Sequence, residues 1–181
     1  VWFDANDPST IDLVPHWLDK SNAGRVAAAH GSPVLNPTAI NGMPAMSYSG
    51  ANGQYHEFGD ITNIRTIFWV WKDDGGFYFM LGDNDKYHFH RGSFLFNSNH
   101  TSAYVKEGLF KLNGTKVFTT ATNPPSTMSI FSLRTTGNVE ASNFSSDRFI
   151  GGRYARGDLA ELLVYNTALD DSQISNIEYY L

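Results

Sequence analysis

The stretch that decides the fold is residues 66–71, Thr-Ile-Phe-Trp-Val-Trp, which would be apolar on both faces of a β-strand. Side chains alternate between the two faces of a strand, so Trp69 and Trp71 share one face and Phe68 and Val70 share the other. A strand that is apolar on both faces is typical of a sheet covered on both sides. The stretch therefore predicts a central, fully buried strand.

Two further strand-like runs follow, one apolar and one alternating, each after a group of turn-forming residues. Phe77–Leu81 follows Asp-Asp-Gly-Gly at 73–76, and Lys86–Arg91 follows Gly-Asp-Asn-Asp at 82–85. Such residues are typical of tight turns between antiparallel strands. Residues 66–91 are therefore expected to form a three-stranded meander.

The rest of the chain shows the same pattern, in which Gly, Asn, Asp and Pro separate short apolar runs. The further strands expected are Leu109–Leu112, Lys116–Thr120, Met128–Arg134, Arg148–Gly151 and Leu159–Tyr165. Asn113-Gly114 is a strong hairpin signal between the first two of these. Residues 20–40 are poor in aromatics and are expected to be irregular. This spacing favours an all-β sandwich or barrel.

One short helix is expected at the C-terminal end. Asp170 and Gln173 have the spacing of a capping box. Apolar residues then follow at i, i+3 and i+7, namely Ile174, Ile177 and Leu181. This stripe could pack the helix onto the sheet. A weakly capped helical turn is also expected at Asp7–Asp12.

Composition narrows the class of protein. A chain of 181 residues suits a single domain over 1–181, and 14% aromatic with 17% charged residues argues against disorder. The net charge is −5 and no basic block is present, which argues against nucleic-acid binding. No apolar run reaches the roughly 18 residues that a membrane span needs. Because the chain starts at Val1, we interpret it as a domain excised from a longer protein or as a mature chain.

Motifs at both ends and in the middle of the chain carry a resemblance. They are Trp2-Phe3-Asp4-Ala5, Trp17-Leu18-Asp19-Lys20-Ser21, Asn41-Gly42-Met43-Pro44-Ala45, Gly157-Asp158-Leu159-Ala160-Glu161 and Tyr179-Tyr180-Leu181. Their order resembles the concanavalin A-like lectin/glucanase superfamily, and within it the laminin-G-like (LamG) jelly-roll modules. The resemblance implies a two-sheet antiparallel jelly-roll sandwich that binds sugar on a concave face or a loop rim, in some members with Ca²⁺. It indicates little about activity, because this fold hosts lectins, glycosidases, lyases, adhesion modules and virion proteins.

Catalytic motifs are absent from the sequence. Glycosidases need two carboxylates across one cleft, and the E-x-D-x-x-E strand motif of the glucanases of this superfamily is missing. Asp158 and Glu161 are three residues apart, so on a regular strand they would point to opposite faces. Glu161 could be a structural carboxylate that accepts backbone N–H groups, or a site acid. No G-x-S-x-G nucleophile elbow is present either.

A histidine pair offers a first candidate site. His88 and His90 would share one face of the strand expected at 86–91. They could be ordinary polar residues, part of a ligand platform together with Arg91, or zinc ligands with His100 or Asp85 as a third.

Two other groups complete the candidates. Asp83, Asn84 and Asp85 offer clustered oxygen donors that suit Ca²⁺, although such residues also simply favour turns. Trp69 and Trp71 could pack in the core or stack on a sugar. The surplus of large apolar residues in the meander indicates either a covered second face or a binding surface.

These observations favour a non-catalytic recognition module that binds glycan on a secreted, cell-surface or virion-surface protein. The ligand-binding residues expected are Trp69, Trp71, His88, His90 and Arg91. The metal ligands expected, for Ca²⁺, are Asp83, Asn84 and Asp85. The alternatives are an interaction domain of a larger assembly, such as a phage tail fibre or capsid, with its apolar surplus in a subunit contact, and a polysaccharide-active enzyme with a non-standard acid pair.

Overall fold

The structure is a computed structural model that describes residues 1–11, 16–51, 53–75, 79–148 and 150–181. Its strands are β1 (Trp2–Asp4), β2 (Trp17–Leu18), β3 (Val26–His30), β4 (Val34–Ile40), β5 (Met43–Ser49), β6 (Tyr55–Asp73), β7 (Leu109–Leu112), β8 (Thr115–Lys116), β9 (Ser129–Phe144) and β10 (Arg156–Tyr165). Its helices are a 3-10 turn, η1 (Pro8–Thr10), and the α-helices α1 (Ala103–Lys106) and α2 (Asp171–Tyr180). The expected all-β class is therefore confirmed.

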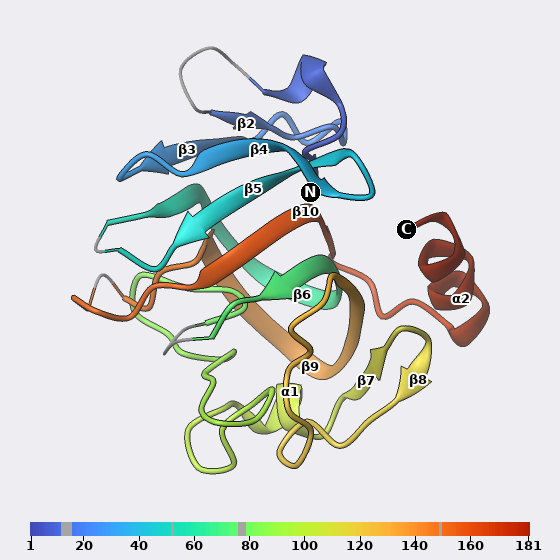
Figure 1. Ribbon diagram of the computed structural model, residues 1–181. Helices are drawn as coiled ribbons and strands as arrows, with labels where there is room; N and C mark the ends of the chain where they lie inside the picture. The colour runs from blue at the N-terminus through green and yellow to red at the C-terminus, as the bar shows by residue number, and fades with distance from the viewer. Residues whose placement is uncertain (12–15, 52, 76–78, 149) are drawn as a thin grey trace.

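The strands form one antiparallel hydrogen-bonded network. The main order is β4-β5-β10-β6-β9-β7-β8, with β1 added on β10, β3 on β6 and β2 on β3. The two longest strands, β6 and β9, pair over most of their length and lie at the centre (Figure 1). Three register shifts between Glu57 and Thr66 interrupt this pairing, and such irregularities let a long strand bend.

The central strand is confirmed. Residues 66–71 lie within β6 and are hydrogen-bonded to β10 on one side and to β9 on the other. Trp69 and Trp71 belong to the main hydrophobic core, while Phe68 on the opposite face packs in a second, smaller core with Leu163 and Ile174. Both faces of the strand are thus covered by the chain itself, as its apolar pattern predicts.

Helix α2 covers the second face, and its capping box is confirmed. The Asp170 side chain accepts a hydrogen bond from the Gln173 N–H at 2.8 Å, and the Gln173 side chain accepts one from the Asp170 N–H at 2.9 Å. Ile174 is buried, and Ile177 and Leu181 are partly buried against the same cluster. The helix begins where its capping residue predicts and buries the predicted stripe.

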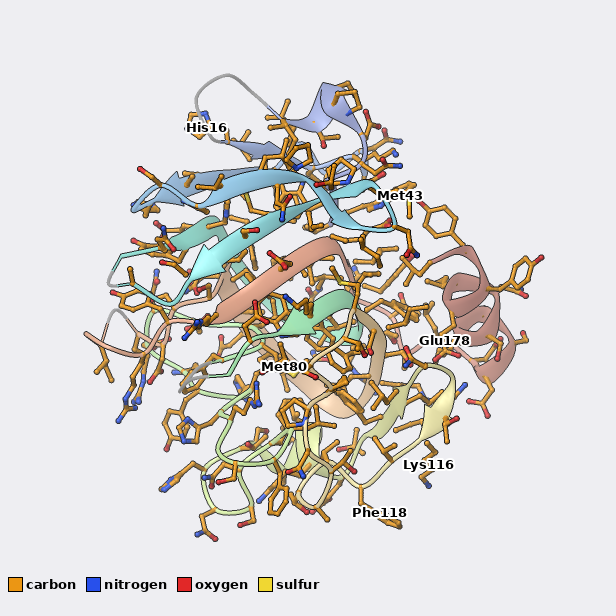
Figure 2. The ribbon with its side chains drawn as sticks, in the orientation of Figure 1. His16, Met43, Met80, Lys116, Phe118 and Glu178 are labelled. Atoms are coloured by element: carbon orange, nitrogen blue, oxygen red, sulfur yellow. The ribbon has the colours of Figure 1, made fainter. Side chains whose placement is uncertain are left out.

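The predicted meander is wrong beyond the first strand. Residues 79–81 and Lys86–Arg91 form turns and loops, with a single bridge between Phe79 and His90; residues 76–78 lie outside the described part. Gly82 instead pairs with Asn143 at the end of β9. The large apolar residues of this segment pack into the core without forming a sheet. Met80, for example, is buried near the middle of the molecule (Figure 2).

Other predicted boundaries also change. Residues 20–40, expected to be irregular, contain β3 and β4. The hairpin at Asn113-Gly114 is confirmed, but β8 ends at Lys116. No strand is found at residues 148, 150 and 151, and residue 149 lies outside the described part. The turn expected at Asp7–Asp12 is the 3-10 turn capped by Asp7, while Asp12 is not described.

No helix among the described residues is both long enough and apolar enough to cross a membrane.

Candidate functional site

The two central tryptophans lie in the core. Trp69 and Trp71 are 0% and 3% exposed, and the Trp69 Nε1–H donates a hydrogen bond to the Met80 carbonyl oxygen at 2.9 Å. A sugar can stack only on a ring face that solvent can reach. The structure therefore gives both rings the core role and leaves neither face open to a ligand.

The Asp83–Asp85 turn is organised by its own side chains. Asp83 Oδ1 accepts the backbone N–H groups of Asp85 at 3.0 Å and Lys86 at 3.1 Å, and burial raises the pKa of Asp83. Asn84 accepts the Ser142 hydroxyl, while the exposed Asp85 carboxylate pairs with Lys86 at 3.0 Å.

The carboxyl groups of Asp83 and Asp85 also contact each other, whereas Asn84 is engaged by Ser142, as in a turn held by local hydrogen bonds. The turn thus brings two carboxyl groups together, fewer than the six to eight oxygen ligands that Ca²⁺ takes. Among the described residues, no group of three or more His, Cys, Asp or Glu side chains could hold a metal ion.

The histidines and Arg91 lie in three different environments, because no strand forms at 86–91. His88 faces Glu140, with 3.6 Å between Nε2 and Oε1. His90 is buried at the bridge to Phe79, where their ring centroids are 4.8 Å apart. Arg91 is buried in an ion pair with Asp73, so the structure gives it a structural role in place of an open binding position.

A polar pocket of about 480 Å³ opens beside this segment. Its described lining comes from three loops: Tyr87, His90, Asn97, His100, Arg148 and Arg153. A shallower hollow of about 270 Å³ adjoins it and shares Tyr87 and His100. One of the histidines expected from the sequence, His90, lines the larger pocket, and His88 lines the smaller one.

A buried carboxylate organises the two arginines of this polar pocket. Asp147 is fully buried, its Oδ1 accepts from Arg148 Nε at 2.8 Å, and its Oδ2 accepts from Arg153 Nη1 at 2.8 Å. Both guanidinium groups remain partly exposed to solvent. Charge-assisted bonds of this kind fix the orientation of a planar group, so the remaining N–H donors are held in place.

Arg148 is held further by its backbone and by a neighbouring ring. Its φ of 46° is left-handed, an uncommon conformation for a residue with a side chain. Its N–H donates to the Asp83 carbonyl oxygen at 3.0 Å, which ties the arginine loop to the Asp83 turn. Its guanidinium lies 4.7 Å from the centroid of the Tyr87 ring. Strain of this kind concentrates at binding and active sites.

The two histidines of the pocket face one another. The rings of His90 and His100 meet edge to face with centroids 5.4 Å apart. Burial lowers the pKa of His90, and the positive charges of the two arginines add to this, whereas the Asp147 carboxylate opposes it. His90 is therefore neutral at pH 7, and the pocket takes its positive charge from the arginines.

Most residues of this polar pocket could not be predicted from the sequence. The sequence carries no signal for Tyr87 or Asn97, indicates His100 only as a zinc ligand, and predicts residue 148 on a strand. The spacing Asp147-Arg148 followed by Arg153 could have indicated a loop closed by ion pairs. That the loop faces the two histidines is a tertiary fact, because more than forty positions separate it from them in the chain.

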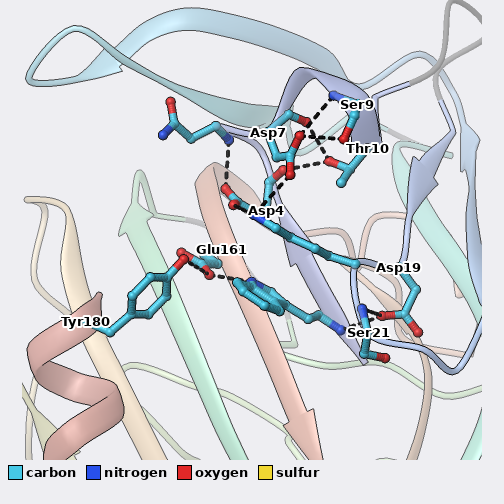
Figure 3. A network of polar contacts seen from close by, with 11 residues as sticks. Asp4, Asp7, Ser9, Thr10, Asp19, Ser21, Glu161 and Tyr180 are labelled. Atoms are coloured by element: carbon cyan, nitrogen blue, oxygen red, sulfur yellow. Dashed lines mark hydrogen bonds and ion pairs between the residues drawn. The ribbon is translucent and has the colours of Figure 1, made fainter.

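Glu161 lies in a second polar cluster beneath α2. Its Oε1 accepts the Trp2 Nε1–H at 2.5 Å and the Tyr180 hydroxyl at 3.3 Å (Figure 3). Its partners are therefore side chains, not the backbone N–H groups suggested for a structural carboxylate. Burial, together with the nearby carboxylate of Asp4, raises the pKa of Glu161 to about 7, although the hydrogen bonds from Trp2 and Tyr180 oppose this rise. Asp4 is paired with Lys20 at 2.8 Å (Figure 3).

The prediction that Asp158 and Glu161 point to opposite faces is wrong. The pairing of β10 with β6 shifts between Leu159 and Glu161, so one extra residue, Ala160, restores both acids to the same face. Each acid nevertheless has separate partners, since Asp158 contacts Ser47 and lies 3.5 Å from Lys72. The bulge therefore does not create a carboxylate pair that shares a substrate.

Comparisons of the chain with protein-family models, with curated proteins and with solved structures find no match, so the site is interpreted from its own geometry.

Proposed function

We propose that this protein is a non-catalytic recognition module that binds a glycan in the polar pocket between the arginine loop and the two histidines. The observation that carries the proposal is the lining itself: the exposed Tyr87 ring, which Arg148 covers on one face, lines the same pocket as the planar side chains of Asn97, His100 and Arg153. Sugar sites combine an aromatic platform with a few fixed polar groups. The order of sequence motifs that resembles LamG jelly rolls supports the same function.

The pocket supports binding better than catalysis. Its described lining contains no carboxylate, whereas glycoside hydrolysis commonly uses two. The acids Asp158 and Glu161 lie elsewhere and are held by partners of their own. We therefore propose a lectin-like role on a secreted, cell-surface or virion-surface protein.

A glycan-array screen tests this proposal, with one arm in Ca²⁺ and one in chelator. The expected result is binding in both arms, because the turn at Asp83 does not fit a calcium cage. The variant His100→Ala should weaken binding, since His100 is exposed and lines both hollows. Lys116→Gln, at an exposed position on β8, serves as control. Absence of binding in both arms, with folded protein, would overturn the proposal.

An interaction domain of a larger assembly is a second candidate, favoured by the edge of the sheet. Val34 on the edge strand β4 is 61% exposed, and Met43 on β5 is 45% exposed (Figure 2). Exposed apolar side chains beside an open strand edge suit a protein contact. Light scattering after chromatography would show an oligomer, which Val34→Lys should dissociate.

A further inference from the structure

We infer that the polar pocket selects an anionic sugar, one that carries a carboxylate or a sulfate ester. This inference rests on the proposed function and specifies the ligand class of the same site. The relevant feature is charge: the described lining contains two arginines but no acid, in a protein whose net charge is −5. A positive pocket on an acidic protein is a local arrangement, not a consequence of overall composition.

The ion pairs of the two arginines with Asp147 leave a net positive charge. Asp147 carries one negative charge and binds both Arg148 and Arg153, so the group as a whole keeps a charge of about +1. Because Asp147 is completely buried, it cannot itself contact a ligand, whereas both arginine side chains reach solvent. The carboxylate therefore orients the two guanidinium groups and leaves their outer N–H groups to bind.

The balance of donors and acceptors points the same way. Asn97 Oδ1 already accepts the N–H groups of Asn99 at 2.9 Å and His100 at 3.0 Å, so the amide of Asn97 has its NH₂ group to offer to the pocket. The arginines are donors only. Hydroxyls of a neutral sugar must donate as well as accept, and a site for them normally supplies acceptors. The acceptors of the described lining are the Tyr87 hydroxyl and the nitrogens of neutral imidazole rings, so the N–H groups of two guanidinium groups and one amide outnumber them. A carboxylate or sulfate only accepts, which matches this excess of donors.

Two matched pairs of polysaccharides test the inference by calorimetry on the intact protein. Polygalacturonate is compared with its methyl-esterified form, and dextran sulfate with dextran, so that each pair differs in charge on one backbone. We expect about tenfold tighter binding of the charged member in at least one pair, the effect typical of a charge-assisted hydrogen bond. The pair that shows it distinguishes a carboxylate from a sulfate.

Variants locate the effect. Arg153→Gln should abolish the preference for the charged member, whereas Lys116→Gln removes the same charge at a distant position and should leave the preference intact. If Arg153→Gln does not fold, Arg153→Lys keeps a charge for Asp147 but removes the planar group, and should reduce the preference by several-fold.

Equal binding of the charged and neutral members would overturn the inference and leave the proposed function standing. Binding of no polysaccharide, here and on the array, would overturn the proposed function itself. A preference for the charged member that survives in Arg153→Gln and Arg153→Lys would also overturn the assignment to this pocket.

Discussion

The indole Nε1–H of Trp2 donates a 2.5 Å hydrogen bond to Oε1 of Glu161, which joins the first strand of the chain to the last. Tyr180 of α2 contacts the Trp2 ring edge to face, with centroids 6.0 Å apart, and its hydroxyl reaches the same oxygen. Three segments distant in sequence therefore meet at one half-buried carboxyl group.

Stability should fall as pH rises through the titration of Glu161. Its pKa is about 7 in the folded protein and about 4.3 in an unfolded chain. Between these values the folded state binds more protons, so raising the pH across this window lowers the free energy of unfolding. Glu161→Gln keeps the acceptor and should remove this slope, which urea denaturation at several pH values measures.

The expected gain of Glu161→Gln over wild type at pH 8 is roughly 1–2 kcal/mol, allowing for the solvent that reaches the group. The control is Glu107→Gln at an exposed position. An unchanged pH slope in Glu161→Gln would show that Glu161 ionises normally.

Gly157 should not tolerate any side chain. Its φ is 148°, and an added Cβ would lie 2.0 Å from the Lys72 carbonyl oxygen and 2.6 Å from the Trp71 ring. Gly157→Ala should therefore cost more than about 3 kcal/mol or prevent folding. Gly151→Ala has open space around the new Cβ and should change stability by less than about 0.5 kcal/mol. Similar melting temperatures for the two variants would contradict this.

Loss of the helix cap should loosen α2. Asp170→Ala removes the acceptor for the Gln173 N–H and should lower Tm by about 2–4 °C in a domain of this size. Asp170→Ser restores a capping oxygen and should recover most of the loss. A Tm equal to wild type in Asp170→Ala would mean that packing of Ile174 alone holds the helix.

Asp147→Asn should damage both the loop and the binding. The substitution keeps the volume but removes the charge that two arginines share, and should cost about 1–3 kcal/mol because the arginines can still reach water. Binding of an anionic polysaccharide should weaken as well, since the guanidinium groups lose their orientation. Asp85→Asn, at a solvent-exposed carboxylate, should leave the urea midpoint unchanged.

Binding of an anionic glycan should strengthen as the pH falls from 7 toward 5. Burial, His100 and the arginines lower the pKa of His90, and Asp147 opposes them. A bound anion adds a negative charge facing His90, which raises its pKa and couples binding to proton uptake. Calorimetry in buffers of different ionisation enthalpy should detect that proton, and His90→Asn should abolish the uptake.

The main strands and the helix could be predicted because their signals are local. Residues 66–71 carry apolar side chains on both faces, and a strand between two neighbours is the arrangement that buries both. Asp170 and Gln173 satisfy each other's backbone N–H groups within one turn, so the start of α2 depends on nothing distant.

The candidate site could be predicted only in part. His88 and His90 line two adjoining hollows, but the strand that is expected to carry them does not form. Residues 86–91 alternate as a strand would, but they form a loop that buries Phe89. The pattern does not distinguish the two cases, because a loop packed into the core and a strand in a sheet both need large side chains. The extra residue at Ala160 likewise places Asp158 and Glu161 on the same face of β10. A two-residue alternation in the sequence does not indicate where such a bulge occurs.

By itself, the sequence determined the β-rich class, the buried central strand, the hairpin at Asn113-Gly114 and the capped final helix, because each depends on neighbours in the chain. Only the tertiary structure decided which polar residues meet. It buries Asp147 and turns Arg148 and Arg153 toward the histidines of another loop. Which polar residues meet depends on the bending of the long strands and on the course of the loops. Contacts between segments distant in the sequence determine both.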